Sequence, residues 1–442
     1  MKSARDIMAL SAGRLGAVLL LALLPLCYGC VSASEIAADR AVTDYMVSDY
    51  INARQELVPL AKQTDENFVL NNDRLGSTTL ALDDLNGAET AFLRSYEVIN
   101  SVGVNDGGRS LGAALVDEKI KVWKGEPFER AMVNFDLGTV YFMRQDYNNA
   151  RAAFENALFK LRDYGDDTDK ADNYREIESD FVLGYLMLGH CWQRLGNPAK
   201  AHDMFQKVAQ LRPDLAGLAD ERAYSAANLL LIVEYGSGPM KVANRDGSIV
   251  GFGPGPREAG YLPLPFVAID GRAAPLGSLN LPPVDLLALA QDRRWQSIDT
   301  IRVIKSVVGT GLIVAGAYEG LGRRHSDPAA ALSLIAAGLL VKASSQGDLR
   351  YWEMLPRTTY ILPMTVPPGR HSVMVYFPSA GNLSQNWADL PVPSSGEAAY
   401  YMRIQNVQQQ YVWPPATLTG LPGYTTGVQG GTQGGTGAPT AG

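Results

Sequence analysis

Apolar positions along the chain follow two different periods. In the first half, from about residue 70 to 215, they recur every three or four residues, the period of an α-helix with one buried face. After residue 228, short apolar runs and alternating stretches bounded by Gly and Pro take over, which is typical of β-strands. The pattern predicts an α+β fold, with a helical array followed by a mixed region that ends in a small β unit.

Three segments of the helical half share one register. In each, a Leu-Gly pair is followed by an Ala and then a Phe on the next helix, and small residues of this kind allow two antiparallel helices to cross closely. The order and spacing match the tetratricopeptide (TPR) repeat. The matching residues are Leu75-Gly76, Ala88 and Phe92; Leu137-Gly138, Tyr141, Ala150, Phe154 and Ala157; and Leu188-Gly189, Trp192, Ala201, Phe205 and Pro213.

The repeats are separated by insertions. Gly76 and Gly138 lie 62 residues apart, and Gly138 and Gly189 lie 51 apart, against about 34 in a regular TPR array. A generic helical bundle is the alternative, but matches at five or more positions in two segments favour the repeat. We therefore predict a TPR-like solenoid over 67–228, whose stacked inner helices line a concave groove.

An apolar run near the N-terminus ends at a cysteine. Leu15–Leu26 follows a charged start, as in a secretory signal, and is shorter than the ~20 residues of a membrane-spanning helix. Gly29 directly before Cys30 resembles the lipobox of bacterial lipoproteins, although Cys27 stands where that motif usually has Leu. The resemblance implies cleavage after 29 and acylation of Cys30, with 30–66 forming a tether and an N-terminal helix; an ordinary signal peptide is the alternative. By resemblance to known lipoprotein sorting, Val31 after the cysteine favours the outer membrane if the host is Gram-negative.

The second half, 229–413, reads as a mixed domain. The run LLLIVEYG predicts a buried strand, 359–366 and 371–377 predict a strand-turn-strand, and AAYYMRIQNVQQQYVW adds another strand. These place a small β-sheet or sandwich unit at 349–413. The Gly- and Thr-rich tail, 414–442, is too poor in apolar residues to fold.

Two small-residue-rich apolar runs lie between these strands, at 306–343. They predict either a membrane-inserted helical hairpin or a helix pair buried in the fold. Each run is only about 12–14 residues long, below the length that spans a bilayer. The buried pair is therefore the favoured interpretation.

Composition narrows the chemistry. The formal net charge is -7, so no basic footprint indicates nucleic-acid binding. Cys191 is the one cysteine beyond the signal region, and the four histidines show no metal-ligand spacing. No nucleophile motif of the Ser-x-x-Lys or Gly-x-Ser-x-Gly type occurs. We expect no catalytic residue, no metal and no cofactor.

The blocks together are similar to a family of bacterial TPR-containing lipoproteins. The likeness covers about residues 70 to 410 and rests on DEKIKVWKGEPFERAMVNFDLGTVYFMRQDYNNAR, VEYGSGPMKV and GDLRYWEMLPRTTYILPMTVPPGRHSVMVYF. It implies a lipid-anchored protein of the cell envelope without an assigned activity. No functional residue can be carried over from the family.

Charged residues crowd around an aromatic residue and a glycine between the first two matched repeats. They form either part of a binding groove or a salt-bridged linker between the helical and β halves, and the linker is the favoured interpretation. The candidate groove or interface residues are Trp123, Lys124, Glu126, Glu129, Arg130, Asn134, Tyr141 and Arg144.

Three functions remain open at this point. The first is a non-catalytic scaffold that binds a protein partner of the envelope through its TPR groove while the lipid holds it at the membrane. The second is an enzyme acting on glycan or peptidoglycan with an unrecognised site, which would need paired carboxylates, an activated nucleophile or a metal. The third is a membrane-inserted assembly subunit that uses 306–341.

Overall fold

The computed structural model describes residues 32–100, 122–161, 163–164, 176–177, 181–243, 249–255, 262–274, 283–292, 349–381, 383–405 and 412–413. Three features predicted above lie outside these residues: the signal region with Cys30, the apolar pair at 306–343 and the tail at 414–442. What the sequence indicates for these three segments therefore remains a prediction. Among the helices that are described, none combines the length and apolarity needed to cross a bilayer.

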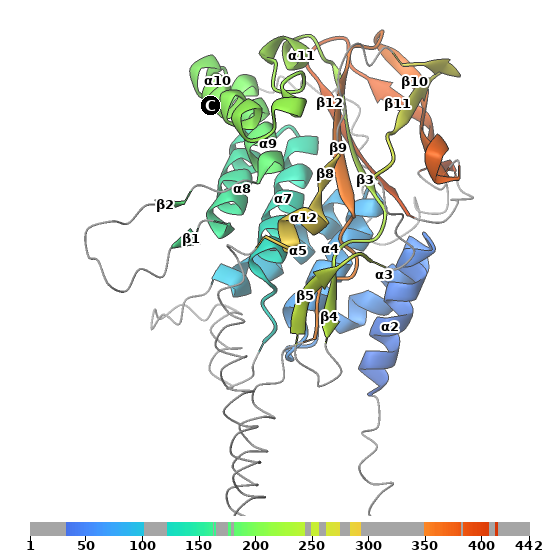
Figure 1. Ribbon diagram of the computed structural model, residues 1–442. Coiled ribbons are helices and arrows are strands. Elements are labelled where there is room, and N and C mark those ends of the chain that lie inside the picture. The colour runs from blue at the N-terminus through green and yellow to red at the C-terminus, as the bar shows by residue number, and fades with distance from the viewer. Residues whose placement is uncertain are drawn as a thin grey trace, which may run out of the picture.

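The molecule has three layers, which confirms a mixed α+β fold. Helical hairpins form the first layer, a sheet of four strands packs against them, and a second sheet packs against the other face of the first (Figure 1). One continuous hydrophobic cluster runs through all three layers. The core therefore extends across the domain boundary predicted at 228/229.

Within the described residues, the helical layer contains four antiparallel hairpins. Each pairs an inner helix with an outer one: α2 (Ala33–Met46) with α3 (Tyr50–Leu60), α4 (Phe68–Ala81) with α5 (Leu85–Asn100), α7 (Pro127–Met143) with α8 (Tyr147–Lys160), and α9 (Val182–Arg194) with α10 (Pro198–Leu211). The array is followed by η2 (Pro213–Leu215) and α11 (Glu221–Ser225). Tyr224 of α11 stacks on Phe205 of α10 with ring centroids 5.4 Å apart, which covers the last hairpin.

The four hairpin turns are built in the same way. Each contains one residue with a positive φ: Ser48 (67°), Asp83 (60°), Gln145 (61°) and Gly196 (72°). The residue that follows is Asp or Asn, and its side chain accepts a hydrogen bond from the backbone three residues on, which caps the outer helix. The backbone N–H of that capping residue also donates to the carbonyl five positions earlier, at 2.8–2.9 Å in all four turns.

The helix crossings explain the glycines of the repeat. A Cβ at Gly76 would lie 2.4 Å from the ring of Phe92, and a Cβ at Gly138 would lie 2.7 Å from that of Phe154. At Gly189 the corresponding distance to Phe205 is 2.8 Å. These distances are too short for any side chain, so a phenylalanine on the outer helix requires glycine on the inner one.

The first hairpin is a fourth repeat that the sequence prediction missed. A tether with one helix was expected over 30–66, whereas the structure has α2 and α3 packed together. Ala41, Ala53 and Leu57 are buried at the positions that Gly138, Ala150 and Phe154 hold in the third hairpin, counted from the capping residue. A smaller outer side chain allows alanine at the crossing, and this combination lacks the Gly and Phe that mark the other three.

The two sheets draw strands from most of the second half. The sheet against the helices has the order β12-β3-β9-β8, and the outer sheet has the order β13-β11-β10-β6-β7. Two further pairs are β1-β2 and β4-β5. The strands are β1 (Asp163–Tyr164), β2 (Glu176–Ile177), β3 (Leu229–Tyr235), β4 (Met240–Ala243), β5 (Ile249–Gly253), β6 (Phe266–Ile269), β7 (Arg272–Ala273), β8 (Val284–Asp285), β9 (Thr358–Met364), β10 (Gly369–Phe377), β11 (Leu383–Val392), β12 (Ala398–Ile404) and β13 (Val412–Trp413), with α12 at Leu286–Ala290 and η4 at Pro378–Ala380.

The predicted strands exist, but their partners differ from a local β unit. The run at 229–235 is a fully buried strand, as predicted. Strands β9 and β10 also form, yet they lie in different sheets: β9 pairs with β3 and β8, whereas β10 pairs with β11 and β6. The turn at 367–368 therefore carries the chain from one sheet to the other. The sheets also contain strands from 229–285, so 349–413 alone does not form the β unit.

The crossing geometry predicts a dependence between two positions of the third hairpin. Replacing Gly138 by Ala should lower the free energy of unfolding by about 1–3 kcal/mol, because its Cβ would meet the ring of Phe154. Adding Phe154→Leu recreates the alanine–leucine pair of the first hairpin, so the double variant should be more stable than the sum of the two single changes predicts. Denaturant unfolding of the four proteins measures this coupling. If the two changes had additive effects on the free energy of unfolding, the proposed contact between positions 138 and 154 would be contradicted.

Candidate functional site

The concave face of the helical array is filled by strand β12. This strand is at the edge of its sheet, paired on one side in parallel with β3, and both α4 and α7 contact it (Figure 1). Every residue of α4 except Leu75 is buried, and so is most of α7, because outer helices cover one side of each and the sheet covers the other. The predicted groove exists as a surface of the helices, but the chain itself occupies it.

Alternate residues of this segment turn their side chains towards the helices. Glu397 contacts His190 of α9 and Arg403 contacts Tyr45 of α2, while Tyr401 bonds Glu234 of β3. These three positions are an even number of residues apart, as expected for one face of a strand. Backbone carbonyls of the same set face the array as well. Gln145 donates from its side-chain amide to the carbonyl of Glu397 at 3.0 Å, and the Tyr50 hydroxyl donates to the carbonyl of Arg403 at 3.3 Å. Side chains of the hairpins thus bond an edge of β12 that no described strand pairs.

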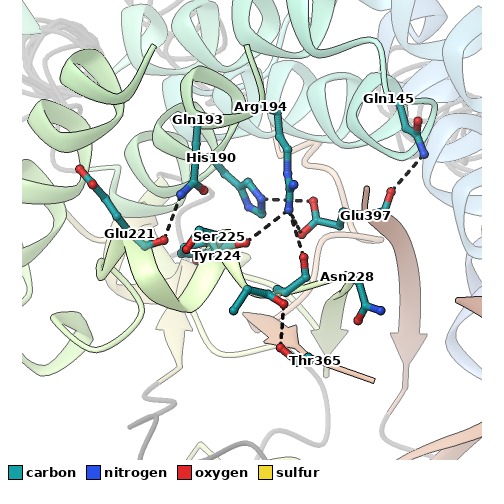
Figure 2. A network of polar contacts seen from close by, with 12 residues as sticks. Gln145, His190, Gln193, Arg194, Glu221, Tyr224, Ser225, Asn228, Thr365 and Glu397 are labelled. Carbon is teal, nitrogen blue, oxygen red and sulfur yellow. Dashed lines mark hydrogen bonds and ion pairs between the residues drawn. The ribbon is translucent and has the colours of Figure 1, made fainter. Parts of the chain in front are cut away.

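A buried ion-pair network holds the start of the strand (Figure 2). One carboxylate oxygen of Glu397 lies 3.0 Å from the Arg194 guanidinium, and the other lies 3.2 Å from Nε2 of His190. The side chains of Glu397 and His190 are fully buried, and that of Arg194 is 19% exposed. Arg194 also donates to the carbonyls of Tyr224 and Ala227, which ties α9 to the segment behind α11.

The other end of the strand is held by Arg403. Its guanidinium donates to the Tyr45 hydroxyl at 3.1 Å and to the carbonyls of Gly236 at 2.5 Å and Leu355 at 3.5 Å. Further bonds reach the carbonyls of Glu234 and Ile404. The side chain lies in the core, with the whole residue 1% exposed. It therefore links the first hairpin, β3, the loop at 355 and β12.

Three carboxyl groups lie buried between these two ends. Burial raises the pKa of Asp136 well above its ordinary value, and the nearby carboxyls of Glu234 and Asp73 raise it further. Burial likewise raises the pKa of Asp73 and of Glu234, although Glu234 accepts a hydrogen bond from the Tyr401 hydroxyl at 2.6 Å. These groups favour their neutral forms, and each has an oxygen without a hydrogen-bond partner.

The charged cluster predicted between the repeats lies where the helices meet the second half. Glu129 is buried at the start of α7 and accepts hydrogen bonds from the backbone N–H groups of Glu126 and Trp352, both at 2.7 Å. Glu126 in turn pairs with Lys241 of β4 at 2.9 Å, and the Trp123 indole donates to the carbonyl of Arg350 at 3.0 Å. These contacts match the linker interpretation of the cluster.

The other candidates separate into different environments. Asn134 is fully buried and donates to the carbonyl of Arg130 one turn earlier, so its expected place on an open groove is wrong. It lies one helical turn before Gly138, on the side of α7 that crosses the outer helix α8. Lys124 and Arg130 are half-buried, and burial lowers the pKa of both. Tyr141 and Arg144 remain partly exposed near the hairpin turn, where Arg144 contacts Glu89 and Asn86.

Sequence reasoning missed the residues that fix β12. A signal was present, since Glu397 and Arg403 are charges at the two ends of an otherwise apolar and aromatic alternating run. Buried charges of this kind need partners, so the run indicates that something polar covers it. No sequence signal of this kind pointed to His190 and Arg194, because a polar residue on a helix is usually solvated.

Comparisons with known proteins add little beyond this geometry. No protein-family model matches the chain, and no curated protein matches it. Two crystal structures of MamA, a TPR-like protein, are similar at 16% and 17% identity with TM-scores of 0.27 and 0.29. The similarity covers 43% and 42% of this chain and 84% and 80% of the MamA chains. TM-scores this low carry no argument. The repeat assignment therefore rests on the turns and helix crossings of the hairpins themselves.

The described residues offer no arrangement suited to a metal. Among them, no three His, Cys, Asp or Glu side chains are placed so that they could hold an ion. The carboxyl groups that do gather, Asp73, Asp136 and Glu234, are sealed between the helices and the sheet. What the arrangement can do is structural: it fixes a strand inside a repeat array.

Glu129 predicts a pH dependence of stability. Burial raises its pKa from 4.5 to about 7, against the opposing effect of Lys241 and the two backbone N–H bonds. The folded state therefore keeps a proton that the unfolded chain releases, and its stability falls as pH rises from about 4.5 to about 7. Glu129→Gln removes this titration. The free energy of unfolding of the wild type minus that of the variant should fall by on the order of 3 kcal/mol over this range.

Denaturant unfolding at several pH values measures this difference. Glu155→Gln is the matched control, since Glu155 is a solvent-accessible carboxylate in a pair with Arg151 on the outer helix α8. A wild-type-minus-Glu129→Gln difference that stays constant from pH 4.5 to 7 would contradict a raised pKa at Glu129.

Proposed function

We propose that this protein is an exported lipoprotein of the bacterial envelope, acylated at Cys30, that acts as a non-catalytic scaffold for a protein partner. The lipobox-like sequence supports the anchor, and Val31 supports the outer membrane with the fold on its periplasmic side. The resemblance to TPR-containing lipoproteins supports an envelope role. The observation that carries the scaffold is the array of four hairpins with identical turn chemistry, since stacked repeats of this type present extended binding surfaces.

The partner surface we propose is the edge formed by the four hairpin turns at Ser48, Asp83, Gln145 and Gly196, which we name the turn edge. It is not the concave face. Strand β12 already fills the concave face, so a partner there would have to displace a buried strand with charges fixed at both ends. At the turn edge, the side chains of Arg144 and Glu89 are 28% and 26% exposed. Tyr141 lies beside them, and burial together with Glu89 raises its pKa to about 12. An aromatic residue, a guanidinium and a carboxylate at partial exposure form the kind of patch that proteins recognise.

A glycan-directed enzyme is the less favoured function. A glycoside hydrolase needs two carboxyl groups on either side of a bond that the substrate can bring to them. In the described part of the chain, the carboxyl groups that gather are in the core and lie beneath β12. This position supports a non-catalytic role.

The test is affinity capture from envelope extract with the full-length protein as bait. The combined change Tyr141→Ala and Arg144→Glu should reduce recovery of the specific partner at least tenfold, because it removes the aromatic residue and reverses the charge of the patch. Arg370→Glu is the matched control, since Arg370 is an exposed arginine paired with Asp389 on the outer sheet. Circular dichroism checks that all three proteins are folded.

The outcomes separate the claims. Loss with the turn-edge variant and retention with the Arg370→Glu control support the surface proposed here. Equal recovery with all three baits would place the partner on another surface. Turnover of peptidoglycan fragments by the purified protein would overturn the non-catalytic proposal.

A further inference from the structure

The first helix that the structure describes starts close after the predicted lipid site. Ser32 caps α2: its hydroxyl accepts a hydrogen bond from the Glu35 backbone N–H at 3.1 Å, while the Glu35 carboxylate accepts one from the Ser32 backbone at 2.7 Å. Only Val31 separates this closed capping box from Cys30. Two residues reach at most about 7 Å. An acyl group on Cys30 would therefore hold the start of α2 at the membrane surface.

The start of α2 belongs to one edge of the helical array, which we name the start edge. Inner helices α2, α4, α7 and α9 begin at this edge, and outer helices α3, α5 and α8 end there, because the hairpins are antiparallel and stacked side by side. The backbone N–H of Trp123 donates to the carbonyl of Glu66 at 2.9 Å, which joins the starts of α4 and α7. In Figure 1 the beginning of α2 and the β4–β5 hairpin lie at the lower side, and the end of α8 lies higher on the left, beside β1.

The two described ends that flank residues 293–348 both lie near the same edge. On the way out, the Gln291 side chain donates to the carbonyl of Phe252 at 2.9 Å, and Phe252 packs on Phe128 at the start of α7 with ring centroids 4.9 Å apart. On the return, Arg350 donates to the carbonyl of Glu66 at 2.8 Å. The sequence between these points carries the apolar runs at 306–343.

Large apolar side chains are exposed along the start edge. Ile36 in the first turns of α2 is 50% exposed, and Leu349 beside Arg350 is 52% exposed. Val242 of β4 is 40% exposed, next to the Lys241 that pairs with Glu126 before α7. Phe159, in the last turn of α8, is 45% exposed. Several aliphatic and aromatic groups on one edge, beside a lipid attachment point, suit the interfacial region of a bilayer.

From this juxtaposition we propose that the start edge, at the beginning of α2 and at β4, lies against the lipid bilayer. The inference rests on the proposed acylation of Cys30 and adds an orientation to it. The turn edge, with Tyr141 and Arg144, then faces away from the membrane and is open to a partner. The occupant of the start edge is the bilayer surface itself.

Two positions of α2 form a matched pair for the test. Ile36 and Val47 are both 50% exposed, and they lie at opposite ends of the helix, roughly 16 Å apart along its axis. Single changes Ile36→Cys and Val47→Cys in the full-length protein accept a thiol-reactive fluorophore, while Cys191 is fully buried. The protein without either change, labelled in the same way, gives the background from Cys27 and Cys30. The labelled proteins are reconstituted into vesicles of phosphatidylethanolamine and phosphatidylglycerol that contain a lipid with a nitroxide quencher at its headgroup. Quenching at position 36 should exceed that at position 47 at least threefold.

A mass measurement on the N-terminal peptide reports acylation separately. An acylated protein with equal or reversed quenching at the two positions would overturn the orientation and keep the lipid anchor. An unmodified protein that is still quenched preferentially at position 36 would overturn the anchor and keep the membrane-facing edge. An unmodified protein without preferential quenching would overturn both.

Discussion

The burial of one guanidinium organises this protein. Arginine has five N–H donors in a fixed plane, and at Arg403 the described acceptors are one tyrosine hydroxyl and four backbone carbonyls. These acceptors come from the first helix, from both sides of the β3 strand end, from the loop at 355 and from β12 itself. A buried charge that lost these partners would cost several kcal/mol. The bonds therefore fix the relative position of segments far apart in the chain.

This constraint changes what the repeat array does. In a free-standing solenoid the concave face is a binding surface, whereas here it packs against the edge strand of a sheet. The strand is held at one end by Glu397 with Arg194 and His190, and at the other by Arg403. The array buries its inner helices against part of its own chain, so that face is closed to a partner. We propose that the turn edge and the start edge take different partners, a protein and a membrane.

The sequence predicted local structure better than long-range pairing. The Gly-Phe crossings at 76/92, 138/154 and 189/205 could be read because each needs a rare residue type at a fixed spacing. The first hairpin escaped because Ala41 and Leu57 meet the same requirement with common residues. Strands β9 and β10 were located, but their sheets could not be, since β3 and β12 pair across more than 160 residues of chain. Of the candidate site, Glu126 and Glu129 lie at a junction between the helices and the second half, which was the favoured interpretation. Asn134 is buried on the Gly138 side of α7, where the outer helix covers it.

Hydrogen exchange measures the central claim most directly, that Arg403 and β12 hold the helices and sheets together as one unit. In the wild type, amides of β12, β3 and the α2–α3 hairpin should exchange with similar, high protection, because opening one requires opening the others. In Arg403→Met, protection should fall in all three segments together, while the α9–α10 hairpin at the far end keeps more of its own. Fast exchange of β12 in a wild type whose hairpins stay protected would contradict the account, because the strand would then not be part of the core.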